Sequence, residues 1–232
     1  MNAAAFSRLV LSVPNGKDSK GHMLVTAGET ISLTVRALDS FGNTISGYKG
    51  KVKFTSTDVQ ASVPTDYTFT VADAGVHTFS MVLKTSNPNG VVWSFSVVDA
   101  SNAASLATIT NFEVNNAVAA KFVFAVPSNA TAGTPFTVKV TVLDAFGNTV
   151  KNYFGKLHFG SSADSLGLPA DYSFNSTDAG VHTFSVTLTT SGNVTLSIFD
   201  VVNSSLTASG VVSVKAVGGG GGGSGGGGSG KP

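Results

Sequence analysis

The sequence contains one long segment twice, and this internal repeat constrains the fold more than any other feature. Residues 27–84 align with residues 132–189 without a gap, at an offset of 132 − 27 = 105, and 27 of the 58 aligned positions are identical. The octapeptide DAGVHTFS occurs unchanged at 73–80 and 178–185. Because a repeat marks a structural unit that the chain forms more than once, we expect two copies of one domain.

The length of the repeat predicts the size and the limits of these domains. Each copy has about 100–115 residues, the usual size of one β-sandwich domain. We therefore predict a first domain over residues 1–115 and a second over residues 116–217, with almost no linker between them. Residues 218–232 read GGGGGGSGGGGSGKP. This composition predicts a flexible tail, natural or engineered, that is dispensable for folding.

The two copies differ in length upstream and downstream of the aligned segment. Leu9–Pro14 matches Phe122–Pro127 at an offset of 127 − 14 = 113, so the first copy has 113 − 105 = 8 extra residues, within Asn15–Val25. Since this insertion is mostly polar, we expect an exposed loop. Downstream, Asp99 matches Asp200 at an offset of 200 − 99 = 101, so the second copy is shorter there.

Apolar and polar residues alternate along both copies, which is the pattern of half-buried strands. Turn sequences such as Phe-Gly-Asn and Asp-Ala-Gly separate these stretches, and no long segment has a helical period. We therefore expect an all-β fold of two tandem sandwiches with seven to nine strands each. The expected core rows include Ile31, Leu33, Val35, Ala37 and Phe79 in the first copy, and Phe136, Val138, Val140, Val142 and Phe184 in the second.

The repeated DAGVHTF motif points to a more specific fold. Immunoglobulin domains carry the pattern D-x-G/A-x-Y-x-C at the corner between strands E and F. Here His77 stands in place of the Tyr and Phe79 in place of the Cys, and the second copy is the same. Together with LDSFGNTI at 38–45 and LDAFGNTV at 143–150, the motif resembles the tandem bacterial immunoglobulin-like (Big/invasin-type) repeats of surface and secreted proteins. The resemblance covers residues 5–217. It implies two immunoglobulin-like sandwiches without a core disulfide, and it says little about function because such repeats are spacers in many proteins.

Histidine is the first residue type that could perform chemistry. The chain has His22, His77, His158 and His182, of which His77 and His182 occupy equivalent positions in the two copies. No second His or paired carboxylate lies at metal-ligand or acid–base spacing in both copies. We therefore expect His77 and His182 to be structural residues at a corner, each hydrogen-bonded to a nearby backbone group.

The repeated Asp-x-Phe-Gly-Asn sequence permits two interpretations. Asp39 and Asn43 in the first copy, and Asp144 and Asn148 in the second, could offer oxygen ligands to calcium. The same residues are those that a tight turn requires, because Gly adopts positive φ and Asp and Asn bond the nearby backbone. The turn is the favoured interpretation, and a calcium site is the alternative.

Two further features are candidates for ligand binding. Lys49, Lys51 and Lys53 alternate, so their ammonium groups project from one strand face and could contact an acidic glycan or a phosphate. Lysines at such positions more often form a solvated face that protects a sheet edge from aggregation. Trp93, the single tryptophan, could stack on a sugar or pack in a sandwich.

Composition excludes several classes of function. Lys and Arg number 14 and Asp and Glu 13, so a net charge of +1 argues against binding to nucleic acid or to anionic membranes. No apolar run approaches the ~20 residues of a membrane span. The absence of cysteine excludes disulfides and thiolate sites. Neither a nucleophile motif nor a phosphate-binding loop is present, so we expect no enzyme and no cofactor.

These observations predict a non-enzymatic structural or adhesion module, a stalk or spacer of a bacterial surface or secreted protein. Its partners would be neighbouring domains of a larger protein and, less specifically, glycans, and its location would be extracellular or at the cell surface. The N-terminus lacks the pattern of an export signal. Two alternatives stay open. One is a phage decoration or fibre protein in a virion surface lattice. The other is an accessory carbohydrate-binding module, whose aromatic platform would need Trp93, Tyr48 and Tyr153.

Overall fold

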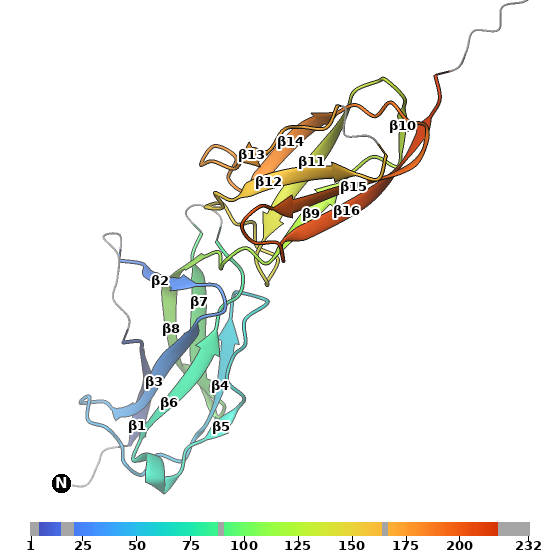
Figure 1. Ribbon diagram of the computed structural model, residues 1–232. Coiled ribbons are helices and arrows are strands. Elements are labelled where there is room, and N and C mark those ends of the chain that lie inside the picture. Colours follow the sequence, from blue (N-terminus) through green and yellow to red (C-terminus); the bar gives the residue numbers. More distant parts are fainter. Residues whose placement is uncertain (1–4, 15–20, 88–90, 164–166, 218–232) are drawn as a thin grey trace, which may run out of the picture. The chain divides into compact units, whose positions relative to one another are not determined.

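The computed structural model describes residues 5–14, 21–87, 91–163 and 167–217, and the structural statements below concern these residues (Figure 1). Most of the predicted loop insertion and the whole glycine-rich tail lie outside the described residues. No helix in the described part of the chain is both long enough and apolar enough to cross a membrane.

The chain divides into two compact units. The first comprises Met1–Ala120 together with Leu143–Lys151, and the second comprises Lys121–Val142 together with Asn152–Pro232. This division differs from the domain limits predicted from the sequence chiefly because it groups residues 143–151 with the first unit. The predicted domain boundary at residue 115 stays a prediction. The expectation of an all-β fold is confirmed in both units, because strands dominate and only one short 3-10 turn interrupts them in the described residues.

The first unit is a sandwich of a three-stranded and a five-stranded sheet. The strand orders are β1-β3-β6 and β2-β8-β7-β4-β5. The elements are β1 (Phe6–Ser12), β2 (Met23–Thr26), β3 (Thr30–Asp39), β4 (Lys51–Ser56), β5 (Tyr67–Thr68), the 3-10 turn η1 (Val71–Asp73), β6 (Val76–Val82), β7 (Trp93–Asp99) and β8 (Asn102–Asn115).

The second unit repeats this architecture strand for strand. Its sheets have the orders β14-β11-β9 and β10-β16-β15-β12-β13. The elements are β9 (Lys121–Ala125), β10 (Asn129–Thr131), β11 (Phe136–Leu143), β12 (Lys156–Ser161), β13 (Tyr172–Ser173), β14 (Val181–Val186), β15 (Gly192–Asp200) and β16 (Thr207–Lys215). The described residues form eight strands in each unit, which falls within the predicted range.

The core lies between the two sheets and contains the apolar rows that the alternation predicts, except that Phe136 is only half-buried. Along β3 the side chains from Ile31 to Ala37 alternate between fully buried and solvent-facing. Phe79 and Phe184, which replace the cysteine of the immunoglobulin motif, are 8% and 7% exposed. Phe79 packs against Phe54, with ring centroids 4.6 Å apart, and Phe184 packs against Phe159 at 4.7 Å. An aromatic cluster therefore occupies the place of the disulfide.

The prediction of an exposed loop within Asn15–Val25 is partly wrong. Its last residues form strand β2, in which Met23 and Val25 are 4% and 3% exposed and belong to the core. Polar neighbours conceal this strand in the sequence, because it is only four residues long. Its counterpart in the second unit is β10.

In each five-stranded sheet, one edge strand pairs with its neighbour in parallel. The other strand pairs of these sheets are antiparallel. β2 pairs with β8 from Met23–Phe112 to Thr26–Asn115, and β10 pairs with β16 from Asn129–Ser213 to Thr131–Lys215. In each unit a strand near the start of the repeat thus runs alongside its last strand, in the same direction.

Candidate functional sites

The Asp-x-Phe-Gly-Asn sequence of the first copy forms a tight turn after β3. The Asp39 carboxylate accepts hydrogen bonds from the backbone N–H groups of Phe41 (2.9 Å) and Asn43 (2.8 Å), and from the Asn43 side-chain amide (3.0 Å). Gly42 has φ of 90°, which explains the glycine. The amide of Asn43 and these backbone donors lower the pKa of Asp39. The carboxylate is therefore occupied by the turn itself.

The second copy builds the same turn. Asp144 accepts from the N–H groups of Phe146 and Asn148, both at 2.9 Å, and from the Asn148 amide at 2.8 Å. The Ala117 N–H adds a fourth bond at 2.9 Å. Burial alone would raise the pKa of Asp144, but these bonds outweigh it and lower the pKa. In the described part of the chain, no three His, Asp or Glu side chains gather as a metal site. The geometry favours the turn, and calcium binding stays an untested prediction.

The DAGVHTF corner forms a hydrogen-bonded network around Asp73. Its carboxylate contacts Nδ1 of His77 at 2.6 Å and accepts from the Tyr67 hydroxyl at 3.0 Å and the Thr70 N–H at 2.6 Å. The rings of Tyr67 and His77 stack with centroids 4.2 Å apart. The Thr70 N–H, followed by His77 and Tyr67, holds the pKa of Asp73 well below its ordinary value. The partner of the histidine is thus a carboxylate, which corrects the expected bond to a backbone group.

The second copy repeats the corner. His182 Nδ1 lies 2.6 Å from Asp178, which also accepts from the Tyr172 hydroxyl (3.1 Å) and the Asn175 N–H (2.8 Å). Burial alone would raise the pKa of Asp178, but these bonds outweigh it and lower the pKa. The hydroxyls of Tyr67 and Thr70 in the first copy, and that of Tyr172 in the second, donate to the same carboxylate as the histidine contacts, so the arrangement orients a corner.

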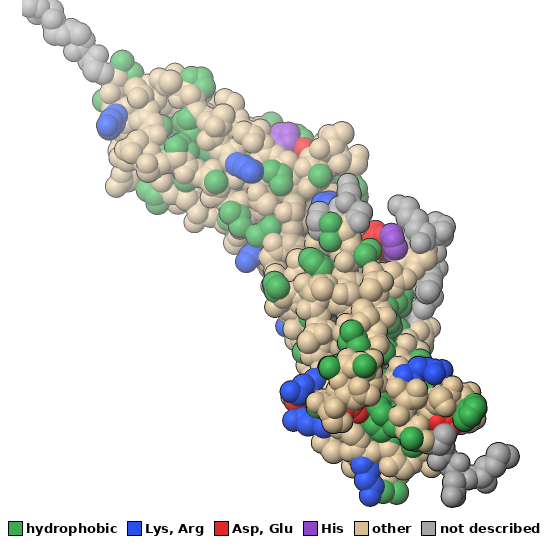
Figure 2. Space-filling view, turned by 180° about the vertical axis from the view of Figure 1, so that it is seen from behind, with side chains coloured by type: hydrophobic (Ala, Val, Ile, Leu, Met, Phe, Trp, Pro, Cys, Tyr) green, Lys and Arg blue, Asp and Glu red, His purple; other side chains and the backbone are tan. Residues whose placement is uncertain are grey.

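The predicted lysine strip is exposed but only part of it is paired. Lys51 forms an ion pair of 3.0 Å with Asp66, and its counterpart Lys156 forms the same pair with Asp171. Figure 2 shows that charged side chains are sparse on the face in view, where uncharged atoms prevail. The ligand-binding role suggested for Lys49, Lys51 and Lys53 stays a prediction.

The aromatic residues considered for a glycan platform are engaged elsewhere. Trp93 is half-buried against the core, and its indole N–H donates to the Thr85 carbonyl at 2.6 Å. Tyr48 and Tyr153 are 6% and 8% exposed. A platform that includes these two tyrosines is therefore excluded by burial.

Each buried tyrosine instead donates to a buried aspartate, a pairing that sequence reasoning did not find. The Tyr48 hydroxyl donates to Asp99, and the Tyr153 hydroxyl donates to Asp200. Burial and the carboxylate together raise the pKa of Tyr48. A Cβ atom at Gly50 would collide with the Tyr48 hydroxyl and the Asp99 carboxylate, so a larger residue there would displace this pair. The sequence indicated this pairing only in that Tyr, Gly and Asp recur at equivalent positions in the two copies.

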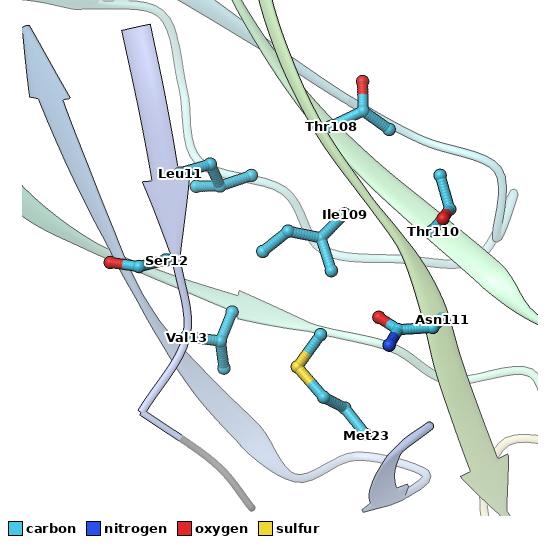
Figure 3. A pocket seen from close by; sticks show the side chains of 8 residues that line it. All are labelled: Leu11, Ser12, Val13, Met23, Thr108, Ile109, Thr110 and Asn111. Atoms are coloured by element: carbon cyan, nitrogen blue, oxygen red, sulfur yellow. The ribbon is translucent and has the colours of Figure 1, made fainter. Parts of the chain in front are cut away.

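A pocket of about 430 Å³ opens in the first unit between the end of β1 and the middle of β8 (Figure 3). In Figure 3 the side chains of Leu11 from β1 and Val13 just after β1 converge with those of Ile109 from β8 and Met23 from β2. The remaining lining residues are Ser12, Thr108, Thr110 and Asn111. The lining therefore combines aliphatic groups with uncharged hydrogen-bonding groups.

Comparisons with known proteins found solved structures that are similar to this chain. The fold is an immunoglobulin-like β-sandwich. Among solved structures the chain is similar to FdeC, an adhesin of Escherichia coli, with 20% identity and a TM-score of 0.44 over 90% of this chain and 65% of that one. It is similar to the D00–D0 domains of intimin, with 11% identity and a TM-score of 0.45 over 88% of this chain and 96% of that one. It is also similar to β-glucuronidase 3 of Bacteroides uniformis, with 14% identity and a TM-score of 0.34 over 89% of this chain and 25% of that one.

At 20% identity or less, these similarities concern the fold alone. No model of a protein family matches the sequence, and no curated protein matches it.

Proposed function

We propose that this chain is a non-enzymatic, load-bearing module, a stalk or spacer of a bacterial surface or secreted protein. The observation that carries the proposal is the parallel pairing of β2 with β8 and of β10 with β16. In each unit these ladders join the beginning of the repeat to its last strand. A force applied to the two ends of a unit loads its first and last strands, and this ladder ties the last strand to the strand that follows the first.

The direction of the strands determines how such a force acts. β1 lies beside β8 in the same direction, and the Leu9 N–H bonds the Ser105 hydroxyl at 3.0 Å. The start of β1 and the end of β8 are consequently at opposite ends of the sandwich. Pulling on them slides the first strands along β8, and the hydrogen bonds of the parallel β2–β8 ladder then resist together rather than breaking one at a time. This is the arrangement that a tensile spacer requires.

The residues that the two copies share are those that make each sandwich rigid. The corner around Asp73 recurs around Asp178, and the Tyr48–Asp99 bond recurs as Tyr153–Asp200. These groups are internal or half-buried, as a structural role requires. The low charge of the surface suits a spacer, because it limits unspecific electrostatic binding.

The proposal can be tested by removing one hydrogen bond from the parallel ladder of the second unit. Ser213 N–H donates to Ser128 C=O (3.0 Å) and Ala132 N–H donates to Lys215 C=O (2.9 Å). Since alternate residues of a strand face the same neighbour, Ala130 N–H also faces β16 and Asn129 N–H faces away. Ala130→Pro therefore removes a ladder bond, and Asn129→Pro is the matched control that removes none.

Single chains would be stretched from end to end, with the first unit as the internal reference. We expect Ala130→Pro to lower the unfolding force of the second unit and to leave that of the first unit unchanged, while Asn129→Pro changes neither. Forced unfolding reports the barrier of the loaded structure. Equal unfolding forces for the two proline variants would show that the parallel ladder does not bear the load, and the proposal would fail.

The location at the cell surface and the attachment to neighbouring domains are parts of the same proposal. No observation favours the virion alternative. The carbohydrate-binding alternative depends on three aromatic residues, and two of them, Tyr48 and Tyr153, are buried in the core.

A further inference from the structure

The Asp-x-Phe-Gly-Asn turn of the second copy packs within the first compact unit, to which residues 143–151 belong. Asn148 is 7% exposed, its amide N–H donates to the Lys84 carbonyl at 2.7 Å, and its carbonyl oxygen accepts from the Ser86 N–H at 2.9 Å. Phe146 is half-buried against the core of this unit. The turn therefore binds with its phenylalanine and its asparagine, and we refer to these two side chains as the plug.

A glycine lies directly under the phenylalanine ring. A Cβ atom at Gly28 would lie 2.4 Å from the ring of Phe146, so the ring rests on the backbone there. The Gly28 N–H donates to the Leu83 carbonyl at 2.9 Å, which places the glycine beside the segment that follows β6. We refer to the surface formed by Gly28 and the backbone of Lys84 and Ser86 as the socket of the first unit.

The second unit has an equivalent socket that is exposed. At the offset of 105, its three positions are Gly133, Thr189 and Ser191, and all three are exposed. The Gly133 N–H donates to the Leu188 carbonyl at 2.8 Å, as in the first unit. A Cβ atom at Gly133 would meet nothing within 4 Å in the described part of the chain, so no ring rests on this glycine. Because the socket uses backbone groups, threonine in place of lysine preserves it.

The first copy carries an equivalent plug that is exposed as well. The Asp39 carboxylate holds this turn in the conformation of the docked one, with φ of 90° at Gly42 and 89° at Gly147. Phe41 is 83% exposed, and Asn43 is also exposed. The hydrogen bonds that form the turn make no use of the Phe41 ring. Since the turn is already rigid, its docking on another surface costs little conformational entropy.

We propose that the plug of the first copy docks in the socket of the second unit of another molecule of this chain. The Phe41 ring would lie on Gly133, and the Asn43 amide would bond the backbone of Thr189 and Ser191. A second molecule is the partner because the chain carries both halves of a contact that it already forms once. Plug and socket are different surfaces, so the contact is head-to-tail and joins molecules into rings or filaments.

The contact is small, and this sets the expected affinity. One ring and two hydrogen bonds amount to far less than the roughly 1,600 Å² that a standard stable interface buries. We therefore expect a dissociation constant on the order of 1 mM, which requires concentrated protein for its detection. The proposal does not depend on the load-bearing role, because the test measures association and no unfolding force.

The test is an NMR titration in which labelled full-length Phe41→Ser, which has the socket but lacks the plug, is mixed with the unlabelled natural chain up to about 1 mM. We expect the signals of Gly133 and Ser191 to shift. The signal of Gly28 should stay unchanged, because that socket is already occupied. Unlabelled Phe41→Ser should cause no shift. Unlabelled Phe154→Ser is the matched control, since Phe154 is also exposed, and it should act as the natural chain does.

Blocking the socket completes the test. A labelled chain with Phe41→Ser and Gly133→Asn should bind the natural chain at least about tenfold more weakly, which corresponds to about 1.4 kcal/mol. Asparagine tolerates the positive φ of 73°, and its Cβ atom would take the place of the ring. Gly21→Asn is the matched control, because Gly21 also has a positive φ and open space around its Cβ position.

Several results would overturn the proposal. These are the absence of shifts at Gly133, equal shifts with unlabelled Phe41→Ser, an equal shift at Gly28, and equal binding when the socket carries Gly133→Asn. If Gly133→Asn fails to fold, the comparison of the natural chain with Phe41→Ser still decides the question, because Phe41 is exposed and its loss leaves the fold intact.

Discussion

Truncation of Phe79 to alanine tests whether the aromatic cluster holds the sandwich together. The side chain is 8% exposed, and its ring lies 4.6 Å from Phe54, 4.6 Å from His77 and 5.3 Å from Tyr67, measured between centroids. Removing a buried phenylalanine costs about 3–5 kcal/mol, because apolar contact is lost and a cavity remains. The loss of several ring contacts places the expected value in the upper part of this range.

Calorimetry of the full chain would measure this effect. For a unit of this size, about 4 kcal/mol lowers the melting temperature by roughly 15 °C, and we expect the shift in one of two transitions only. Phe184→Ala should lower the other transition. Phe41→Ala is the matched control, because Phe41 is 83% exposed and its loss should change stability by less than about 0.5 kcal/mol. A change below about 1 kcal/mol for Phe79→Ala, or equal shifts of both transitions, would refute the reasoning.

Further predictions concern polar groups and glycine. The pKa values of Asp73 and Asp178 are lowered in the folded chain. Both ionised carboxylates therefore stabilise the folded chain when the pH is above 3.8, the ordinary pKa of Asp. This contribution is lost as the pH falls through the lower folded pKa. The melting temperature should therefore fall between about pH 4 and pH 2, and less steeply in Asp73→Asn; an unaltered slope would contradict the network. Tyr48→Phe removes the tyrosine hydroxyl that donates to Asp99 and should destabilise the first unit by about 1–3 kcal/mol in chemical denaturation, whereas no loss would mean that the bond is unimportant. Gly50→Ala should destabilise more than Gly47→Ala, whose Cβ would meet nothing within 4 Å, and equal melting temperatures would refute the close contact.

The sequence predicted the strands well because most of them follow one physical rule. Along β3, buried and exposed side chains alternate as Ile31 to Ala37 indicated. The repeat also located the core phenylalanines, since a copied apolar residue in a copied strand has the same surroundings. Strand β2 was missed because a strand of four residues between polar neighbours provides too short a pattern.

The candidate sites were harder to predict because they depend on long-range side-chain pairing. Tyr48 looked available for a ligand, but its partner Asp99 is 51 residues away and becomes a neighbour only after folding. His77 was correctly placed at a corner, yet the choice between a backbone and a carboxylate partner depends on local geometry. The pocket near Ile109 arises from a bulge, which alternation does not reveal.

The central claim is that each sandwich resists force by shearing its first strands against its last. Because the chain has no cysteine, pairs of engineered cysteines can direct the force through the first unit in two ways. Ala5, Ser101 and Asn115 are all exposed. Handles on Ala5→Cys and Asn115→Cys pull the parallel strands in opposite directions. Handles on Ala5→Cys and Ser101→Cys lie at one end of the sandwich and pull β1 away from the start of β8 without shearing the β2–β8 ladder. We predict a clearly higher unfolding force in the first geometry at the same loading rate, whereas an equal or lower force would contradict the account.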